Sequence, residues 1–183
     1  MPFDTQQLIS LQAIAFDVDG VLTDDTLQWS STGEESKRFS YADIMGISLL
    51  GRLGVKMALI SGEASPLVYR FAKKMHVHFV ITNTNDKASV LRDFTKQLGV
   101  PLEHTCFFGN DVNDLSAMEI AGLCACPSNA ATEVRTYVSE CGYLSLLPGG
   151  QGAVRSFVDV ILATRGLRGR DVFQLQLPKL SLH

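Results

Sequence analysis

Two aspartates near the N-terminus have the type and position of residues that act on a metal ion or a transferring group. Asp17 and Asp19 follow an apolar run, Ile14 to Phe16, which is typical of a buried strand, and Gly20 marks the turn that leaves it. Open α/β sheets bind ligands beyond the carboxyl ends of their strands. The pattern alone also fits a strand that ends in a polar turn, and the later loops of the chain are needed to choose between the two.

Three further polar loops are predicted at the same edge of a sheet. They hold Ser61 and Gly62 after a strand at 55–60, Lys87 at the start of a helix, and Asn110, Asp111 and Asp114 after a strand at 105–108. Carboxylates with other oxygen donors favour a hard cation such as Mg²⁺. A cation and a lysine beside one carboxylate suit phosphoryl transfer, because both offset charge on the phosphoryl oxygens while the carboxylate attacks.

The elements that would position these loops alternate between strand and helix, which predicts an α/β fold with a doubly wound, mainly parallel sheet. Alternation near Leu27 and turn residues at 31–34 predict a short β-hairpin after the first strand. Asp43 is predicted to cap a helix that Gly54 ends, and Pro66 to open the next one. No phosphate-binding Gly-x-x-x-x-Gly-Lys loop and no Gly-x-Gly-x-x-Gly turn is present, which disfavours a P-loop enzyme and a dinucleotide dehydrogenase.

The composition is that of a globular protein. The chain has 183 residues, of which 46% are hydrophobic and 19% charged, and its net charge of −3 gives no indication of nucleic-acid binding. No apolar run is long enough to cross a membrane and no signal peptide is evident, so we expect a cytoplasmic protein without a membrane partner. The cysteines form no Cys-x-x-Cys pair, and Cys124 and Cys126 lie in an apolar stretch, so reduced core thiols are expected rather than a metal site.

We expect a single domain from residue 1 to residue 166 and a C-terminal tail from 167 to 183. The tail begins with basic residues and then alternates, with Val172, Phe173, Leu175, Leu177 and Leu180 as its apolar members. Two interpretations remain open: a disordered tail in a monomer, or a segment that packs on a neighbouring subunit because its apolar residues need cover.

The four loops together resemble the four motifs of the haloacid dehalogenase superfamily. The matching segments, in chain order, are Asp17–Thr23, Ile60–Gly62, Asp86–Lys87 and Gly109–Asp114. The resemblance implies an aspartyl-phosphate intermediate with Asp17 as the nucleophile. Asp19 would act as general acid and then as general base, and Lys87 would stabilise the attacking carboxylate.

The same resemblance implies the remaining ligands of the site. Ser61 and the Gly62 amide would bind phosphate. Mg²⁺ would be held by the Asp17 carboxylate, the Asp19 carbonyl and the last motif, through Asn110 or Asp111. Asp114 is expected to orient Lys87 or a water molecule rather than to bind the metal directly.

A narrower resemblance covers nearly the whole chain. The hairpin, the pair Gly46–Ile47 and the loop Gly149–Arg155 are similar to 3-deoxy-D-manno-octulosonate 8-phosphate phosphatases. The segments between the first and second motifs and between Lys87 and Gly109 are too short for a cap domain. Capless members of this family form tetramers in which a neighbour's hairpin and tail help to close each site. A homotetramer, a phosphorylated sugar acid as substrate and a role in lipopolysaccharide biosynthesis are therefore implied.

Three positions depart from that family's pattern. Asn110 stands where an aspartate is usual, which removes a charge from the metal site. Glu63 stands where an arginine is usual; an arginine suits a carboxylate, whereas a glutamate suits hydroxyls and resembles relatives that act on nine-carbon sugar acids. Tyr41–Ile44 replaces an Arg-Asp-Gly sequence and removes another cation. The residues expected to contact substrate, besides the phosphate ligands, are Glu63, Arg70, Lys74 and Arg155.

Three functional hypotheses follow. The first is a Mg²⁺-dependent phosphatase for a 2-keto-3-deoxy sugar-acid phosphate such as 3-deoxy-D-manno-octulosonate 8-phosphate. The second, which Glu63 favours, is a phosphatase for a nine-carbon acylneuraminate 9-phosphate. The third is a non-catalytic oligomerisation module linked to sugar-acid activation; Asp17, Asp19 and Lys87 count against it, and Asn110 leaves it open.

Overall fold

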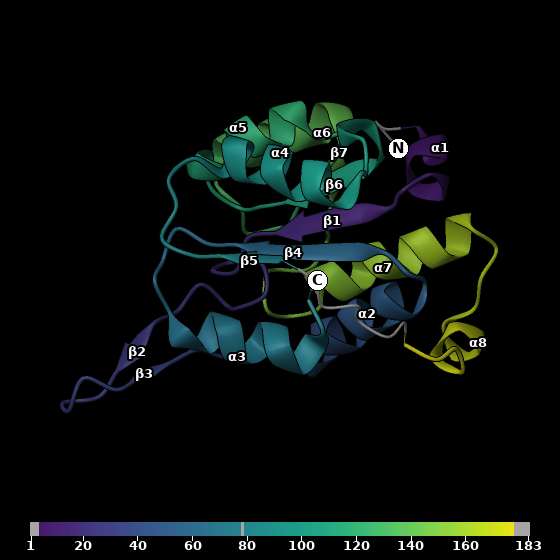
Figure 1. The fold of residues 1–183 in the computed structure, drawn as a ribbon. Coiled ribbons are helices and arrows are strands. Elements are labelled where there is room, and N and C mark those ends of the chain that lie inside the picture. The colour runs from purple at the N-terminus through teal and green to yellow at the C-terminus, as the bar shows by residue number, and fades with distance from the viewer. Residues whose placement is uncertain (1–3, 78, 178–183) are drawn as a thin grey trace.

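Apolar runs buried on both faces form the centre of a six-stranded parallel sheet (Figure 1). The structure is a computed structural model that describes residues 4–77 and 79–177. Its strands are β1 (Ala13–Phe16), β4 (Lys56–Ile60), β5 (Phe79–Ile81), β6 (Thr105–Phe108), β7 (Leu123–Cys126) and β8 (Tyr143–Leu144), in the order β5-β4-β1-β6-β7-β8. Every pairing is parallel. Such strands are hydrophobic throughout because helices cover both faces. The predicted α/β fold with a doubly wound, mainly parallel sheet is confirmed.

Helices form a layer on each face of the sheet (Figure 1). One layer consists of α4 (Lys87–Leu98), α5 (Leu115–Ile120) and α6 (Thr132–Cys141), and the other of α2 (Tyr41–Arg52), α3 (Pro66–Met75) and α7 (Ala153–Thr164). Two short 3-10 helices, η1 (Leu102–His104) and η2 (Val112–Asp114), flank β6. Each layer closes its own hydrophobic core over the sheet. The polar loops leave from the carboxyl ends of β1, β4 and β6.

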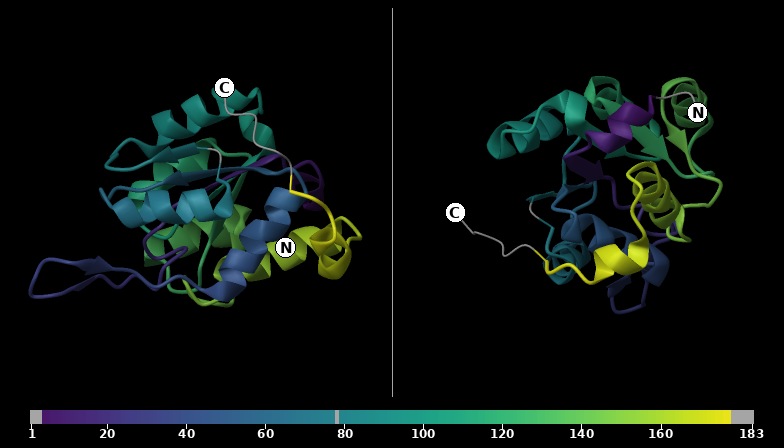
Figure 2. Two further views of the ribbon diagram at one scale, coloured as in Figure 1. Left: turned by 60° about the horizontal axis from the view of Figure 1, so that its bottom comes forward. Right: turned by 90° about the vertical axis from the view of Figure 1, so that its right-hand side faces the viewer.

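The predicted hairpin is present and projects from the body of the molecule (Figure 2). Its strands are β2 (Gln28–Trp29) and β3 (Glu35–Ser36), which pair antiparallel with Trp29 opposite Glu35. Trp29, which is the only tryptophan in the sequence, is 72% exposed, although tryptophan side chains are usually mostly buried. Since the segment between β1 and α2 holds only this hairpin, no cap domain covers the site here.

The start of α2 corrects one sequence prediction. Ser40, not Asp43, caps this helix, because the Ser40 side chain accepts a hydrogen bond from the Ala42 backbone. Asp43 lies in the first turn with 1% of its surface exposed, and its two oxygens accept hydrogen bonds from the Gly152 and Arg155 backbones at 3.0 and 2.9 Å. A buried carboxylate needs such donors, and here it ties α2 to the beginning of α7.

Two short helices were not predicted from the sequence. α1 (Thr5–Ile9) begins at a capping box formed by Asp4 and Gln7. α8 (Gly169–Phe173) falls in the segment expected to be a tail, and it packs on α2 of the same chain with Val172 buried in the core. The tail's packing on a neighbouring subunit stays a prediction, and Leu180 lies outside the described residues.

Among the described residues, no helix combines the length and the apolar composition needed to cross a membrane. The cysteines are free thiols, and Cys106, Cys124 and Cys126 are buried as expected. Cys141 is exposed at the end of α6, so it is not part of the core, although its sulfur lies 3.7 Å from that of Cys124.

Candidate active site

A small cavity opens where the loops after β1, β4 and β6 meet. Its volume is about 160 Å³, and it is lined by Asp17, Asp19, Asp25, Ser61, Gly62, Glu63, Asn110, Asp111 and Asn113. Three of the four loops predicted from the sequence therefore converge on one space. The fourth loop contributes Lys87, which contacts Asp17 but does not line the cavity.

Asp17 and Lys87 form the buried centre of the site. Asp17 directly follows β1, and its backbone N–H donates to the Phe108 carbonyl of β6, which extends the sheet's pairing by one residue. Lys87 Nζ donates to Asp17 Oδ1 at 2.7 Å and to Asp114 Oδ1 at 2.6 Å. Only 1% of Lys87 and 5% of Asp17 is exposed. A lysine at the first position of a helix opposes the helix dipole, so these two carboxylates account for its place.

The charges in this centre do not balance. Burial would lower the pKa of Lys87, but Asp17 and Asp114 outweigh burial and raise it above the usual value, so the ammonium stays charged. Burial, followed by the negative charge of Asp114, raises the pKa of Asp17 to about 7 although Lys87 opposes the shift. One ammonium thus faces two buried carboxylates. A further positive charge would favour the ionised form of Asp17, which is the nucleophilic form of a carboxyl group.

The loop after β6 is built around Asp114. Asp114 is fully buried, and its Oδ2 accepts hydrogen bonds from the backbone N–H groups of Asn110 and Asp111 at 2.8 and 3.1 Å. Gly109 lets this carboxylate approach, because a Cβ there would lie 2.5 Å from the Asp114 carboxyl carbon. Asp114 therefore shapes the loop with one oxygen and holds Lys87 with the other.

Asn110 bridges the first and last loops. With its nitrogen turned inward, its side-chain amide donates to Asp17 Oδ2 at 3.2 Å and to the Asp19 carbonyl at 3.0 Å. Gly20 permits this contact, since it has a φ of 87° and a Cβ there would lie 2.0 Å from the Asn110 amide. Asp111 is exposed, and its carboxylate instead caps Val112 at 2.7 Å. Of the two residues considered for the metal, Asn110 is the one that the structure places against Asp17 and Asp19.

The donor set fits a hard divalent cation. Asp17 Oδ2 and the Asp19 carbonyl oxygen share the Asn110 amide as a neighbour, and an amide turned over would add a third oxygen. Oxygen-only ligands with few carboxylates suit Mg²⁺, which keeps several waters. No cluster of three His, Cys, Asp or Glu side chains able to hold a metal occurs in the described part of the chain.

The loop after β4 supplies hydrogen-bonding groups. Ser61 is buried, and its Oγ accepts a hydrogen bond from the Glu63 backbone at 3.1 Å. Gly62 and Glu63 line the cavity beside it, and Glu63 is exposed. Ser65 then caps α3, with Pro66 in the first turn as predicted. The serine, the Gly62 backbone and an acidic side chain thus face the space next to Asp17.

Lys37 is the residue that sequence reasoning missed. It lies just after β3, its side chain is 3% exposed, and its Nζ contacts Asp19 Oδ1 at 2.6 Å. The sequence carries no signal for this pair, because the partners are separated by the hairpin and Lys37 sits in a polar segment. The structure therefore adds a cation beside Asp19 that the motifs do not contain.

The remaining predicted substrate contacts lie outside the cavity. Arg70 and Lys74 are exposed on α3 and border a second space of about 370 Å³ near Lys37 and Tyr41, where Lys74 Nζ lies 5.9 Å from the Tyr41 ring centre. Arg155 pairs with Asp159 on its own helix at 2.9 Å and does not line the cavity of Asp17. The structure thus brings Asp17, Asp19, Ser61 and Lys87 together, but Arg70, Lys74 and Arg155 lie apart from them.

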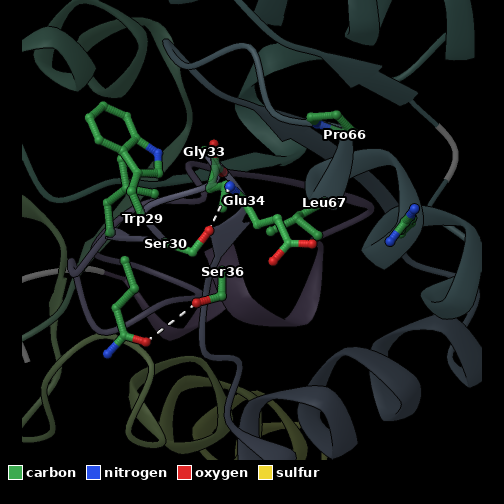
Figure 3. A pocket seen from close by; sticks show the side chains of 11 residues that line it. Trp29, Ser30, Gly33, Glu34, Ser36, Pro66 and Leu67 are labelled. Atoms are coloured by element: carbon green, nitrogen blue, oxygen red, sulfur yellow. Dashed lines mark hydrogen bonds between the residues drawn. The ribbon is translucent and has the colours of Figure 1, made fainter.

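A broad groove lies between the hairpin and the start of α3 (Figure 3). Its volume is about 1120 Å³, and its walls include Trp29, Glu34, Pro66, Leu67 and Arg70. Figure 3 shows the Ser30 hydroxyl accepting a hydrogen bond from the Glu34 backbone, which holds the turn of the hairpin. This groove is exposed and bordered by few charged groups, unlike the small cavity around Asp17.

The glycine-rich loop before α7 packs against the loop that follows β1. Gly150 has a φ of 63°, its N–H donates to the Val21 carbonyl at 3.0 Å, and a Cβ there would lie 2.4 Å from the Thr23 carbonyl carbon. A Cβ at Gly149 would lie 1.8 Å from the Gly20 carbonyl oxygen. The loop therefore serves close packing against the Asp17–Thr23 segment.

Comparison with known proteins identifies relatives of this arrangement. Residues 59–141 match the family described as haloacid dehalogenase-like hydrolase. A 3-deoxy-D-manno-octulosonate 8-phosphate phosphatase of Haemophilus influenzae is 32% identical over 161 residues, which are 88% of this chain and 88% of that protein. The sequence-based recognition of this family is confirmed.

Two solved structures share the fold. The phosphatase of the same name from Moraxella catarrhalis, in complex with a magnesium ion, a phosphate ion and a 3-deoxy-D-manno-octulosonate molecule, has a TM-score of 0.85 and 32% identity over 92% of this chain and 94% of its own. The cobalt-bound Haemophilus influenzae enzyme has a TM-score of 0.82 and 31% identity over 88% and 92%. Both relatives hold a divalent cation.

Proposed function

This chain belongs to the haloacid dehalogenase-like hydrolases, within the family of 3-deoxy-D-manno-octulosonate 8-phosphate phosphatases, and we propose that it hydrolyses the phosphate ester of a 2-keto-3-deoxy sugar acid through an aspartyl-phosphate on Asp17. The observation that supports this proposal most is the buried contact of Lys87 with Asp17 and Asp114, beside a cavity that Asp19 and Ser61 also reach. Two buried carboxylates that share one ammonium are costly to fold, and a non-catalytic module would not require them.

The proposed reaction assigns one task to each group. Asp17 attacks phosphorus in line, while Lys87 and the Ser61–Gly62 loop bind the phosphoryl oxygens. Asp19 gives a proton to the leaving alkoxide and later takes one from the attacking water. Mg²⁺ would be held by the Asp17 carboxylate, the Asp19 carbonyl and, with the Asn110 amide turned over, the Asn110 side-chain oxygen. Bound Mg²⁺ supplies positive charge that offsets the phosphoryl oxygens and favours ionised Asp17.

The substrate that we propose first is 3-deoxy-D-manno-octulosonate 8-phosphate, on the strength of the named relatives. Glu63 supports the second candidate, a nine-carbon acylneuraminate 9-phosphate. It is exposed at the mouth of the cavity, where its charge would disfavour a substrate carboxylate and its oxygens would accept hydrogen bonds from hydroxyls.

We further propose that the enzyme is a cytoplasmic homotetramer acting in lipopolysaccharide biosynthesis. The described cysteines are free thiols, as in a reducing compartment. Large side chains are exposed on the hairpin and at the start of α2, namely Trp29 at 72% and Tyr41 at 81%, and a neighbouring subunit would cover them. Multi-angle light scattering measures the subunit number directly, and a monomer would contradict this part of the proposal.

Activity is tested with p-nitrophenyl phosphate and a panel of eight- and nine-carbon sugar-acid phosphates, with Mg²⁺ and with EDTA. We expect hydrolysis that requires Mg²⁺ and that falls about 10⁵-fold in D17N, since the nucleophile is lost. D93N is the matched control, because Asp93 is exposed on α4. Equal rates for D17N and wild type would overturn the phosphatase function, and preference for a hexose phosphate would overturn both sugar-acid candidates.

A further inference from the structure

Lys37 is a buried cation that the catalytic motifs do not include. It belongs to the returning half of the hairpin, yet its side chain turns into the protein with 3% of its surface exposed. The next residue, Arg38, is 80% exposed and lies 3.6 Å from Asp24. A lysine can usually extend its flexible stem to water, so burial of this ammonium requires specific partners.

Asp19 is the first of these partners. Lys37 Nζ lies 2.6 Å from Asp19 Oδ1, whereas Asp19 Oδ2 has no hydrogen-bond partner among the described residues. The orientation of this carboxyl group therefore depends on a single donor. Asp17, by contrast, is held by Lys87 and by the Asn110 amide.

Lys37 is itself fixed from a second side. Glu35 Oε1 lies 3.8 Å from its Nζ and accepts a hydrogen bond from Ser65 Oγ at 2.7 Å. Ser65 caps α3, which begins directly after the Ser61–Glu63 loop. The contacts thus run from Asp19 through the hairpin to the helix behind the phosphate-binding loop, and they define where Lys37 Nζ lies.

We propose that Lys37 is a positioning residue that orients the Asp19 carboxyl group for proton transfer to the leaving group. The inference rests on the proposed phosphatase function. In the first half-reaction an Asp17 oxygen bonds to phosphorus, the bond from phosphorus to the ester oxygen breaks, and that oxygen takes the proton of Asp19. In the second, Asp19 takes a proton from water, the water oxygen bonds to phosphorus, and the bond to Asp17 breaks to release inorganic phosphate.

Two substrates with different leaving groups can distinguish a role of Lys37 in positioning Asp19 from a general structural role of Lys37. p-Nitrophenolate leaves without being protonated, whereas the sugar alkoxide of 3-deoxy-D-manno-octulosonate 8-phosphate must take a proton. In K37M we expect kcat/KM for the sugar phosphate to fall about 30-fold, through kcat, because general acid catalysis contributes about 10²–10⁴-fold. kcat/KM for p-nitrophenyl phosphate is expected to change less than about threefold.

Three variants complete the experiment. K37R restores a donor to Asp19 and is expected to recover most of the lost kcat. R38M removes the neighbouring cation and is expected to leave both substrates unaffected. D19N should reproduce the leaving-group dependence of K37M with a larger loss. Unfolding in urea checks that each variant is folded.

Failure of the inference differs from failure of the proposed function. If K37M lowers kcat/KM for both substrates by the same factor, or acts only on KM, Lys37 is a structural or binding residue and the proposal is wrong. If wild type does not hydrolyse the octulosonate phosphate, the substrate assignment fails instead. K37M and wild type are then compared on p-nitrophenyl phosphate and on the alkyl phosphate of the panel that wild type hydrolyses fastest. A loss confined to the alkyl phosphate supports the proposal, and an equal loss with both substrates contradicts it.

Discussion

The cavity around Asp17 and the outer surface formed by the hairpin and α3 are built on opposite principles. Beside the cavity, Asp17, Lys87 and Asp114 are buried, and each charge lies within hydrogen-bond distance of another. At the mouth of the cavity and on α3, by contrast, Glu63, Arg70 and Lys74 are exposed. Buried charges interact strongly and are costly to unpair, whereas exposed ones are screened by water. We therefore expect the buried groups to have larger effects than the exposed ones when they are substituted.

The largest effect on stability is expected from removal of the shared cation. K87M leaves the carboxylates of Asp17 and Asp114 buried without their ammonium, so we expect the free energy of unfolding in urea to fall by about 3–5 kcal/mol. K96M, an exposed lysine on the same helix, is the matched control and should change it by less than about 0.5 kcal/mol. A similar change in the free energy of unfolding in K87M and K96M would contradict the expectation that buried charges contribute more than exposed ones.

The second prediction concerns pH. The pKa of Asp17 is raised from 3.8 to about 7 in the folded protein, so its ionisation disfavours folding progressively between those values. Without metal, D17N should match wild type near pH 4 and exceed its stability by about 1–2 kcal/mol at pH 8. This is less than the full shift would give, because Lys87 also loses a partner. The raised pKa of Lys87 contributes stability that is fully present at both of these pH values and is lost only when the pH rises above about 10.5.

Urea unfolding in EDTA at both pH values measures this difference. Added Mg²⁺ should stabilise wild type and leave D17N nearly unchanged, because the variant lacks the side-chain carboxylate of the metal site. A D17N protein that is less stable than wild type at pH 8 in EDTA would show that Lys87 outweighs burial at Asp17.

The same contrast explains which features were predictable from the sequence. Asp17, Ser61, Lys87 and Asn110 could be assigned together because a parallel sheet brings the carboxyl ends of its strands to one edge, whatever the side-chain details. The hairpin followed from alternation and turn residues. These are local patterns combined with one rule of topology.

Lys37 and Asp43 were missed because their roles depend on tertiary contacts. Whether Lys37 points to Asp19 or to water is set by the path of the chain after β3, which no local pattern encodes. Asp43 has the residue type of a helix cap, but the Gly152 and Arg155 backbones compete for its oxygens and Ser40 takes the cap. In the tail, alternation gave no indication of α8, since burial of Val172 against the core outweighs that pattern.

The third prediction tests the metal site inside the cavity. N110D replaces an amide by a carboxylate next to Asp17 Oδ2 and the Asp19 carbonyl, so it adds a ligand charge for Mg²⁺. We expect the Mg²⁺ affinity, measured by isothermal titration calorimetry, to rise about tenfold. The metal-free variant should be less stable than wild type, because a third carboxylate joins Asp17 and Asp114. N113D adds the same charge to the same loop at an exposed position and should raise the affinity less than about threefold. An unchanged affinity in N110D would mean that Asn110 is not a ligand.

The smallest effect is expected from the exposed surface. E63R reverses the charge at the mouth of the cavity and offers a bidentate partner to a sugar-acid carboxylate. Because Glu63 is exposed, screening limits the change to about 1 kcal/mol, or about fivefold in the ratio of kcat/KM between the eight-carbon and nine-carbon substrates, in favour of the former. E103R reverses a charge at the opposite end of β6, where η1 precedes the strand, and should leave the ratio unchanged. The rate with p-nitrophenyl phosphate should stay within about twofold of wild type in both variants, since neither touches Asp17 or Lys87. A loss of that activity in E63R would place Glu63 among the groups that perform the reaction and would remove the division between a catalytic interior and a variable surface.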